Sequence, residues 1–193
     1  ITIADSDILD FTSEITIEAW VMLAEAKPAG QGQHYVVDSR DKKGGGYGLN
    51  INTELIQFWI CGKWYRDFPS SVQVGKWHHT VGTYDGSEMV VYVDGVEMGR
   101  YSRTTNITRS SSPLYIGQWW NHGERFHGAI GEVAIYNRAL SPEEIQQHYE
   151  SGLNGIGYEL TPSYVFTTID FPGAIYTVAR SINNANRIVG EYE

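Results

Sequence analysis

The fold class of this chain is decided by residues 77–95, which read WHHTVGTYDGSEMVVYVDG. Two runs of β-branched and aromatic residues each end in an Asp-Gly pair, the first at Asp85-Gly86 and the second at Asp94-Gly95. Asp-Gly between such runs is the strongest short-range hairpin signal, because both central residues of the tight turn must tolerate a positive φ. The stretch therefore predicts antiparallel strands joined by two-residue turns.

The same alternation of apolar and polar residues recurs through residues 1–140. Residues 15–23 form the longest example, and their odd-numbered apolar side chains share one face of a strand. Residues 52–54 are typical of the turn of a hairpin. Further strands are expected at residues 34–38, 47–51, 55–60, 114–117 and 131–136.

One helix is predicted, near residues 143–150. Residues 141–144, Ser-Pro-Glu-Glu, supply a cap serine, a first-turn proline and a capping-box glutamate in order. Gly152 follows at a position typical of a C-terminal cap. Three later residues share a face at helical spacing, namely Ile145, His148 and Tyr149. Many strands and one short helix predict an all-β protein, a sandwich of two antiparallel sheets with jelly-roll topology and one helix closing an edge.

Composition narrows the class of protein. The chain has 193 residues, 41% hydrophobic and 19% charged, which excludes a disordered chain and a coiled coil. A net charge of -9 without clustered Lys or Arg argues against a nucleic-acid partner. No apolar run approaches the roughly 20 residues of a membrane-spanning helix, so membrane insertion is not expected. A single cysteine, Cys61, excludes an internal disulfide and a cysteine-based zinc site.

A linker-like stretch follows Gly152, at residues 153–157, and predicts that the chain has two parts. Residues 1–157 form the main domain, and residues 158–193 form a short β-rich tail. A tail of about 30 residues cannot bury a core of its own. We therefore expect residues 163–193 to add strands to an exposed sheet edge, in this chain or in a second copy. Because the chain starts at Ile1 without Met or a signal-like segment, we expect a mature or excised piece.

Five blocks of the main domain together resemble a known family, over residues 1 to about 152. The set closely resembles the laminin-G-like, concanavalin A-like jelly-roll domains that are common in secreted bacterial proteins. The resemblance implies the fold far more strongly than the function, since this fold hosts lectins, carbohydrate-binding modules, adhesive modules and some hydrolases and lyases. The blocks are residues 9–21, 77–86, 91–95, 114–117 and 132–141.

The tail carries a resemblance of its own. Residues 166–174, FTTIDFPGA, followed by residues 179–190, ARSINNANRIVG, are similar to a bacterial extracellular repeat of the HAF type. That repeat normally occurs in tandem, and one copy is visible here. The resemblance implies a parent protein that continues past Glu193.

Catalysis is not expected. Glucanases of this architecture place a nucleophile and an acid on alternate residues of one strand, as Glu-x-Asp-x-x-Glu, so that both reach one groove. Glu14 and Glu18 have no acidic residue between them, and no Gly-x-Ser-x-Gly nucleophile elbow occurs. A polysaccharide lyase or glycoside hydrolase of jelly-roll fold is the third-ranked alternative.

His78 and His79 are adjacent, so in a strand they point to opposite faces and cannot share a metal ion. We expect one buried, hydrogen-bonded histidine inside the sandwich and one that points outward. Neither is expected to be catalytic.

No cofactor is predicted with certainty, although calcium is an open possibility. Domains of the family that this chain resembles often hold calcium with an Asp that directly precedes the Glu-Val of the final strand. In this chain Gly131 stands at that position. Calcium takes six to eight oxygen ligands. Asp5, Asp7 and backbone carbonyls remain as candidate donors.

Aromatic residues outside the family blocks give the best indication of a binding site. Trp20 and Trp77 fall in the blocks and are expected in the core. Trp59 falls outside the blocks. Two apparent loop segments combine aromatic, amide and charged groups, which suits sugars because rings stack on pyranose C–H faces and planar polar groups bind hydroxyls. The alternative is that these rings fill the gap between the sheets or hold the tail. The predicted ligand-binding residues are Trp64, Tyr65, Arg66, Trp119, Trp120, Asn121 and Arg125.

The sequence therefore predicts a non-catalytic, lectin-like carbohydrate-binding module of a secreted, extracellular bacterial protein, with a polysaccharide or other glycan as partner. The alternative function is that of an adhesion module, which binds another protein or a second copy of itself through the exposed aromatic residues and the C-terminal tail.

Overall fold

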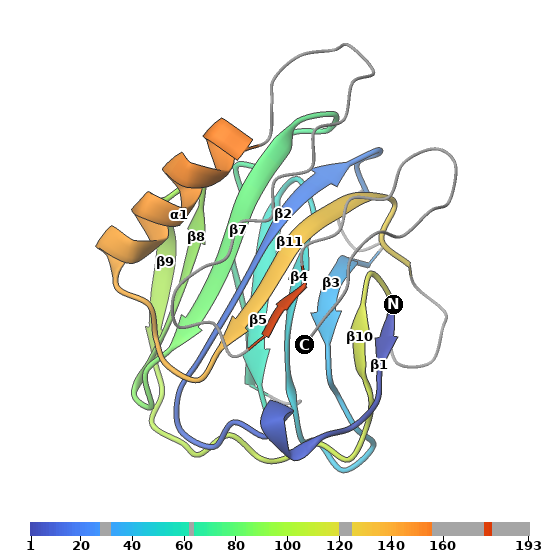
Figure 1. The fold of residues 1–193 in the computed structure, drawn as a ribbon, viewed down its shortest axis with the longest axis vertical. Helices are drawn as coiled ribbons and strands as arrows, with labels where there is room; N and C mark the ends of the chain where they lie inside the picture. The colour runs from blue at the N-terminus through green and yellow to red at the C-terminus, as the bar shows by residue number, and fades with distance from the viewer. Residues whose placement is uncertain (28–31, 62–63, 120–124, 156–175, 179–193) are drawn as a thin grey trace.

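Two antiparallel six-stranded sheets pack face to face in the computed structural model, which describes residues 1–27, 32–61, 64–119, 125–155 and 176–178 (Figure 1). Sheet A has the strand order β1-β10-β3-β4-β5-β6, and sheet B has the order β12-β11-β2-β7-β8-β9. The predicted jelly-roll sandwich is confirmed. The strands are β1 (Thr2–Ile3), β2 (Ile15–Leu23), β3 (His34–Asp38), β4 (Tyr47–Ile51), β5 (Leu55–Ile60), β6 (Trp64–Pro69), β7 (Trp77–Tyr84), β8 (Glu88–Val93), β9 (Val96–Ser102), β10 (Leu114–Ile116), β11 (Gly128–Tyr136) and β12 (Tyr176–Val178). A short 3₁₀ helix, η1 (Asp7–Leu9), and one α-helix, α1 (Pro142–Gly155), complete the described elements.

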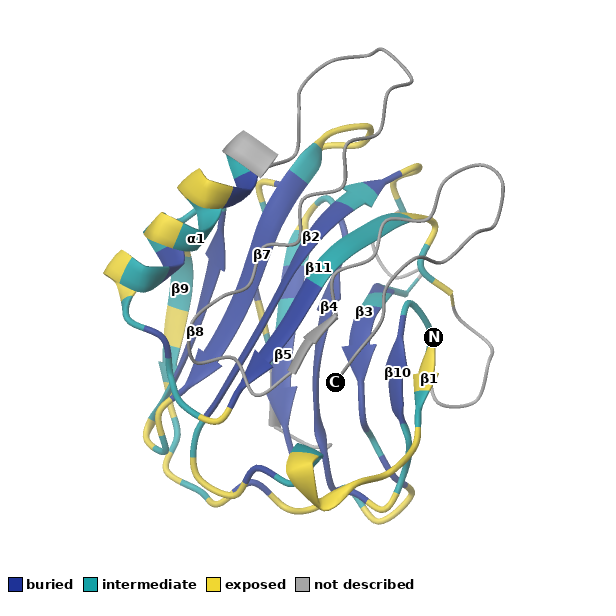
Figure 2. Ribbon diagram, in the orientation of Figure 1, coloured by how far each residue is buried: buried dark blue, intermediate teal, exposed yellow. Residues whose placement is uncertain are grey.

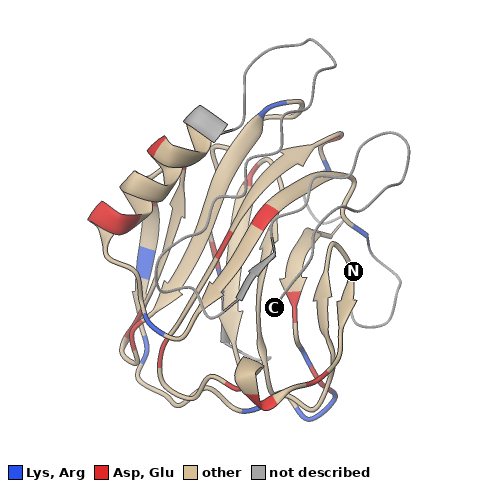
Figure 3. Ribbon diagram, viewed as in Figure 1, with Lys and Arg blue, Asp and Glu red and all other residues tan. Residues whose placement is uncertain are grey.

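The core lies between the two sheets, whose central strands are largely buried (Figure 2). The odd-numbered residues of β2 all face this core and are fully buried, as the alternation predicted. Charged residues lie mainly in the connecting loops and on α1, so few of them interrupt the strands (Figure 3). The apolar inner faces thus account for the two-layer architecture.

The two Asp-Gly turns behave differently from each other. At Asp94-Gly95 both residues have positive φ, 53° and 75°, as expected for the tight turn between β8 and β9. At Asp85-Gly86 only the glycine does, with φ 92°. There the Asp85 carboxylate accepts hydrogen bonds from the backbone N–H groups of Ser87 and Glu88, at 2.8 and 2.7 Å, and this side chain holds a longer turn together.

Helix α1 begins as predicted and ends later. The Ser141 hydroxyl accepts a hydrogen bond from the Glu144 N–H at 3.2 Å, and the Glu144 carboxylate accepts one from the Ser141 N–H at 2.9 Å, which confirms the capping box. The prediction of Gly152 as the C-terminal cap is wrong, because the helix continues through Gly155. Gly152 instead lies against Trp20, where a Cβ atom would lie only 2.5 Å from the indole ring.

Helix α1 covers the outer face of sheet B and creates a second apolar cluster there. Trp20 is buried as expected, beneath this helix rather than between the sheets. Trp77 is only half-buried, so the expectation that it lies in the core is wrong. His79 does point outward from the sandwich, but it is also buried. The second cluster contains Val81, Val90, Tyr92, Ala134, Tyr136, Leu140 and Ile145.

The tail contributes one described strand. β12 pairs antiparallel with β11 in the same chain, with Val178 opposite Val133 and Tyr176 opposite Ile135. The remaining residues of the tail, with most of the repeat-like sequence, lie outside the described residues. Within the described part of the chain, no helix is both long and apolar enough to cross a membrane.

Gly152→Ala tests the contact between α1 and Trp20. An exposed helical glycine normally gains stability on replacement by alanine, but here the added methyl overpacks the indole ring and should cost about 1–3 kcal/mol. Thermal unfolding should show a Tm lower by about 2–4 °C per kcal/mol lost. Ser151→Ala, the exposed neighbour, is the control and should leave Tm unchanged or raise it. A higher Tm for Gly152→Ala would contradict the observed packing.

Removal of residues 158–193 tests the docking of the tail. The edge of β11 loses its β12 partner, so the shortened chain should melt at a lower temperature or associate through the newly exposed edge. Differential scanning calorimetry and size-exclusion chromatography measure the two effects. An unchanged Tm and an unchanged elution volume would show that this pairing contributes nothing.

Candidate ligand-binding face

The outward face of sheet A consists of the side chains that point away from sheet B. It combines buried polar side chains with aromatic rings. Strand pairing aligns these side chains in two rows, since residues opposite one another on adjacent strands point to the same side. The first row runs through Tyr115, Asp38, Gly48 and Trp59. The second row runs through Tyr35, Asn50, Gln57 and Asp67.

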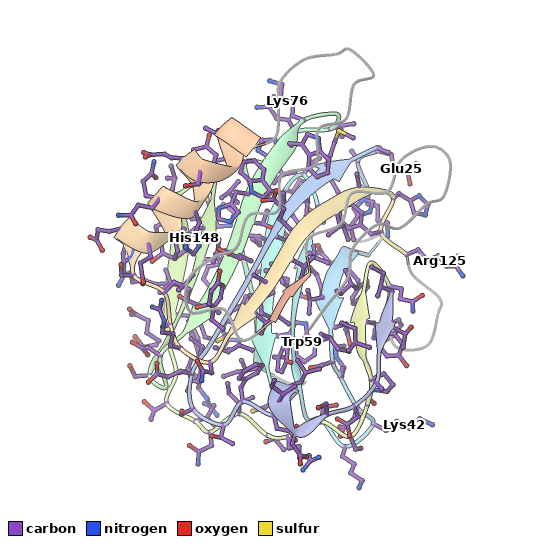
Figure 4. All side chains as sticks on the ribbon, in the orientation of Figure 1. Glu25, Lys42, Trp59, Lys76, Arg125 and His148 are labelled. Carbon is purple, nitrogen blue, oxygen red and sulfur yellow. The ribbon has the colours of Figure 1, made fainter. Side chains whose placement is uncertain are left out.

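Trp59 stands at the end of the first row and lies over Gly48. A Cβ atom at position 48 would collide with the indole, 2.6 Å from its Nε1, so the missing side chain makes room for the ring. The Arg40 guanidinium lies over the ring, 4.3 Å from its centroid, in a cation–π contact. Trp59 is therefore fully buried although it faces away from the core (Figure 4).

Asp38 is a buried carboxylate beside this ring. Its Oδ1 accepts a hydrogen bond from the Arg40 N–H at 2.9 Å, while its Oδ2 lies 3.7 Å from Arg40 Nη2, beyond hydrogen-bond distance. Burial raises the pKa of Asp38 to about 6, against the opposing charge of Arg40.

A chain of hydrogen bonds follows the second row. Gln57 Nε2 donates to Asp67 Oδ1 at 2.7 Å, and Asn50 Nδ2 donates to Gln57 Oε1 at 3.0 Å. The three side chains come from β4, β5 and β6, and they lead from the exposed Asp67 to the fully buried Asn50.

Four buried polar atoms on or beside this face have no hydrogen-bond partner. Native proteins leave few such atoms, and each one suggests a missing partner such as water, an ion or a ligand. Two of the four accept and two donate, so groups that both donate and accept, above all hydroxyls, would satisfy them. The acceptors are Asp38 Oδ2 and Asn50 Oδ1, and the donors are Trp59 Nε1 and Arg40 Nε.

Trp119 joins this face as an aromatic platform. Its ring stacks on Tyr35 with centroids 5.8 Å apart and an interplanar angle of 10°, and both side chains are half-exposed. Gln118, the preceding residue, donates a hydrogen bond to the Thr2 hydroxyl of β1 at 3.3 Å. Of the residues predicted from sequence, Trp119 is the one whose described side chain lies on this face.

The other predicted residues are placed elsewhere or lie outside the described side chains. Trp64 and Tyr65 belong to strand β6 and not to a loop, because this segment pairs with β5, and only their backbone is described. Arg66 reaches toward sheet B, donating to the Tyr101 hydroxyl at 2.6 Å. Arg125 is exposed and extends from one edge of the molecule (Figure 4). Trp120 and Asn121 lie outside the described residues.

Sequence reasoning missed the polar residues of the face. The alternation in β4 and β5 contained the signal, since Leu49 and Ile51 point inward and so turn Asn50 outward. The same argument places Gln57 outward. Nothing in the local sequence indicated that the outward position of Trp59 would be buried.

A second polar cluster lies beneath α1, around the fully buried Glu18. Tyr136 donates to Glu18 Oε1 at 2.7 Å, and His148 Nδ1 and His79 Nε2 lie 3.0 and 3.4 Å from Oε2. Burial opposes ionisation of Glu18, but the hydrogen bonds from His148 and His79 outweigh it and lower its pKa to about 2. This cluster joins α1 to sheet B, with His148 on the helix (Figure 4).

The acidic residues near the start of the chain are engaged with an arginine. Asp7 and Asp10 form ion pairs with Arg109 at 2.8 and 2.7 Å. Asp5 is exposed. Among the described residues, no group of three His, Cys, Asp or Glu side chains is arranged to hold a metal ion.

Comparisons with known proteins agree on the fold. Residues 1–146 match the Laminin_G_3 model, described as the concanavalin A-like lectin/glucanases superfamily. An alignment of 92 positions, which covers 44% of this chain, is 32% identical to usherin of Rattus norvegicus and covers 2% of that protein. The match thus spans only a small fraction of the length of usherin.

Solved structures are similar at low sequence identity. A candidate carbohydrate-binding protein from Bacteroides ovatus has a TM-score of 0.62 and 17% identity, covering 76% of this chain and 43% of that one. Domain 4 of AbnA, a GH43 extracellular arabinanase from Geobacillus stearothermophilus solved with arabinotriose, has a TM-score of 0.58 and 18% identity, covering 76% and 70%. At these identities the likeness shows the fold alone.

Glu132→Gln tests the electrostatics near Glu18. Burial first, and then the Glu18 charge, raise the pKa of Glu132 to about 7. Because the folded state holds this proton above the pKa of the unfolded chain, the contribution of Glu132 to stability is full below about pH 4.5 and is lost as the pH rises through about 7. The Tm of Glu132→Gln relative to the parent chain should therefore be higher at pH 8 than at pH 5.

The control for this measurement is Glu54→Gln, which removes an exposed carboxylate on the β4–β5 turn. Its Tm difference from the parent at each pH measures the effect of removing a carboxylate far from Glu18. If the Glu132→Gln difference changes between the two pH values no more than the Glu54→Gln difference does, the raised pKa of Glu132 is contradicted.

Proposed function

The chain belongs to the concanavalin A-like lectin/glucanases superfamily through its Laminin_G_3 domain, and we propose that it is a non-catalytic carbohydrate-binding module. The ligand is a polysaccharide or other glycan, held on the outward face of sheet A. The parent protein is extracellular and bacterial, and residues 158–193 of this chain include one HAF-type repeat.

The observation that carries this proposal is the set of four unpartnered polar atoms around Trp59 and Asn50, beside a stacked aromatic pair. Each sugar hydroxyl donates one hydrogen bond and accepts others, which fits a site with both unmet donors and unmet acceptors. The half-exposed rings of Tyr35 and Trp119 offer a surface for the C–H faces of a sugar ring.

The centre of the face is covered in the free protein. Trp59, Asp38 and Asn50 have no exposed surface, and Arg40 lies over the indole ring. A sugar that stacks on Trp59 must therefore displace the Arg40 guanidinium, which then becomes free to bind a hydroxyl. Binding begins at the exposed rim, where Trp119 is located, and extends toward this centre.

The spacing of the carboxylates supports binding without cleavage. Asp38 lies on β3 and Asp67 on β6, three strands apart in sheet A. Adjacent strands are about 4.8 Å apart, so these strands are separated by about 14 Å. Paired carboxyl groups of glycosidases lie roughly 5–9.5 Å apart. A lyase or hydrolase is accordingly the less favoured alternative.

The similar structures support a binding role by analogy, because one is a candidate carbohydrate-binding protein and another is an arabinanase domain in complex with arabinotriose. The alternative to carbohydrate binding is a protein-binding function, namely self-association through the tail. It is less favoured because β12 pairs with β11 in its own chain.

Trp119→Ala should lower the affinity for a binding polysaccharide about 30-fold, since a stacking ring contributes on the order of 2 kcal/mol. Its Tm should change little because the ring lies outside the core. Affinity electrophoresis across neutral and acidic polysaccharides, with and without EDTA, identifies the ligand, and isothermal titration calorimetry measures Kd. Val96→Ala, an exposed apolar residue on β9, is the control and should bind as the parent does.

Two results would overturn this function. If no polysaccharide binds the parent chain, the adhesion alternative replaces it. Release of reducing sugar or unsaturated uronate from a bound polysaccharide would show that the module is an enzyme.

A further inference from the structure

The hydrogen-bond chain on the outward face of sheet A has a fixed direction. A carboxylate offers only acceptors, so Asp67 Oδ1 must receive an N–H from Gln57, which turns the Gln57 amide nitrogen toward β6. The amide oxygen of Gln57 then faces β4, where it must receive an N–H from Asn50. The far end of the chain is consequently Asn50 Oδ1, a buried acceptor without a partner.

The second open acceptor points to the same ligand chemistry. Asp38, like Asn50, is fully buried, and its Oδ2 accepts no hydrogen bond, with Arg40 Nη2 3.7 Å away. A ligand that reaches this part of the face must donate hydrogen bonds to both oxygens. A carboxylate or sulfate group donates none and would be repelled by Asp38 and Asp67.

We infer that Asp67, acting through Gln57, fixes Asn50 as an acceptor and thereby selects a neutral glycan over an anionic one. This inference rests on the proposed function and adds the substrate class. Asp67 is a positioning residue, because it sets the polarity of Asn50 from a distance of two strands.

Replacement of Asp67 by Asn removes the fixed direction. An asparagine presents either an oxygen or an N–H to Gln57, so the amides of Gln57 and Asn50 can both reverse and Asn50 can offer an N–H to the ligand. Asp67 is exposed, so Asp67→Asn should fold normally. Gln57→Leu breaks the same chain while it leaves the Asp67 charge in place, which separates positioning from simple repulsion.

The experiment measures Kd for the full chain with linear arabinan, xylan and mixed-linkage glucan as neutral probes, and with polygalacturonate and alginate as acidic probes. The parent should bind at least one neutral probe about tenfold or more tightly than any acidic probe, the effect of about one hydrogen bond to a charged group. Asp67→Asn and Gln57→Leu should both reduce this ratio several-fold. Glu143→Gln, which removes an exposed charge on α1 across the sandwich, should leave the ratio unchanged.

The outcomes separate this inference from the proposed function. Equal or tighter binding of an acidic probe by the parent overturns the neutral class and leaves carbohydrate binding intact. A change with Asp67→Asn but none with Gln57→Leu overturns positioning in favour of charge repulsion. If no probe and no other polysaccharide binds, the proposed function fails, and the inference fails with it.

Discussion

The packing of the two inner sheet faces is the constraint on which the rest of this structure depends. Gly82 of β7 lies against Phe58 of β5, where a Cβ atom would lie 2.5 Å from the phenyl ring. Each strand has two faces, and the core uses one face of every central strand. A ligand can therefore bind only on the outer faces or at the ends of the sandwich.

The two outer faces have different fates. Helix α1 closes the outer face of sheet B, where Trp20 packs against Gly152 and Glu18 collects hydrogen bonds from three side chains. These bonds fix the helix in place, although His79 Nδ1 and the nearby Glu132 Oε2 have no hydrogen-bond partner. Sheet A has no such helix among the described residues, and its outer face keeps unsatisfied donors and acceptors. This difference, and not the fold itself, makes the outer face of sheet A the candidate ligand-binding face.

The candidate site is built from strands and not from the loops that the sequence indicated. Trp59 is buried on an outward position because Gly48 makes room for its ring and Arg40 covers it. Asn50, although a small amide, gains a defined orientation from Gln57 on β5 and, through it, from Asp67 on β6. Rigid strands hold such groups more firmly than loops do, which suits recognition of a ligand with many similar hydroxyls.

The sequence by itself determined most of the strands, the Asp94-Gly95 turn, the start of α1 and the inward face of β2, because alternation, Asp-Gly pairs and a capping box act over a few residues. It did not determine β6, whose first residues were expected in a loop. The tertiary structure alone decided which outward positions share a row, because strand register joins residues such as Asp38 and Trp59 that are distant in sequence. The tertiary structure also decided the role of Gly152. This glycine does not end α1 but leaves room for the Trp20 ring on β2. Local chemistry thus set the elements, and packing between them set the site.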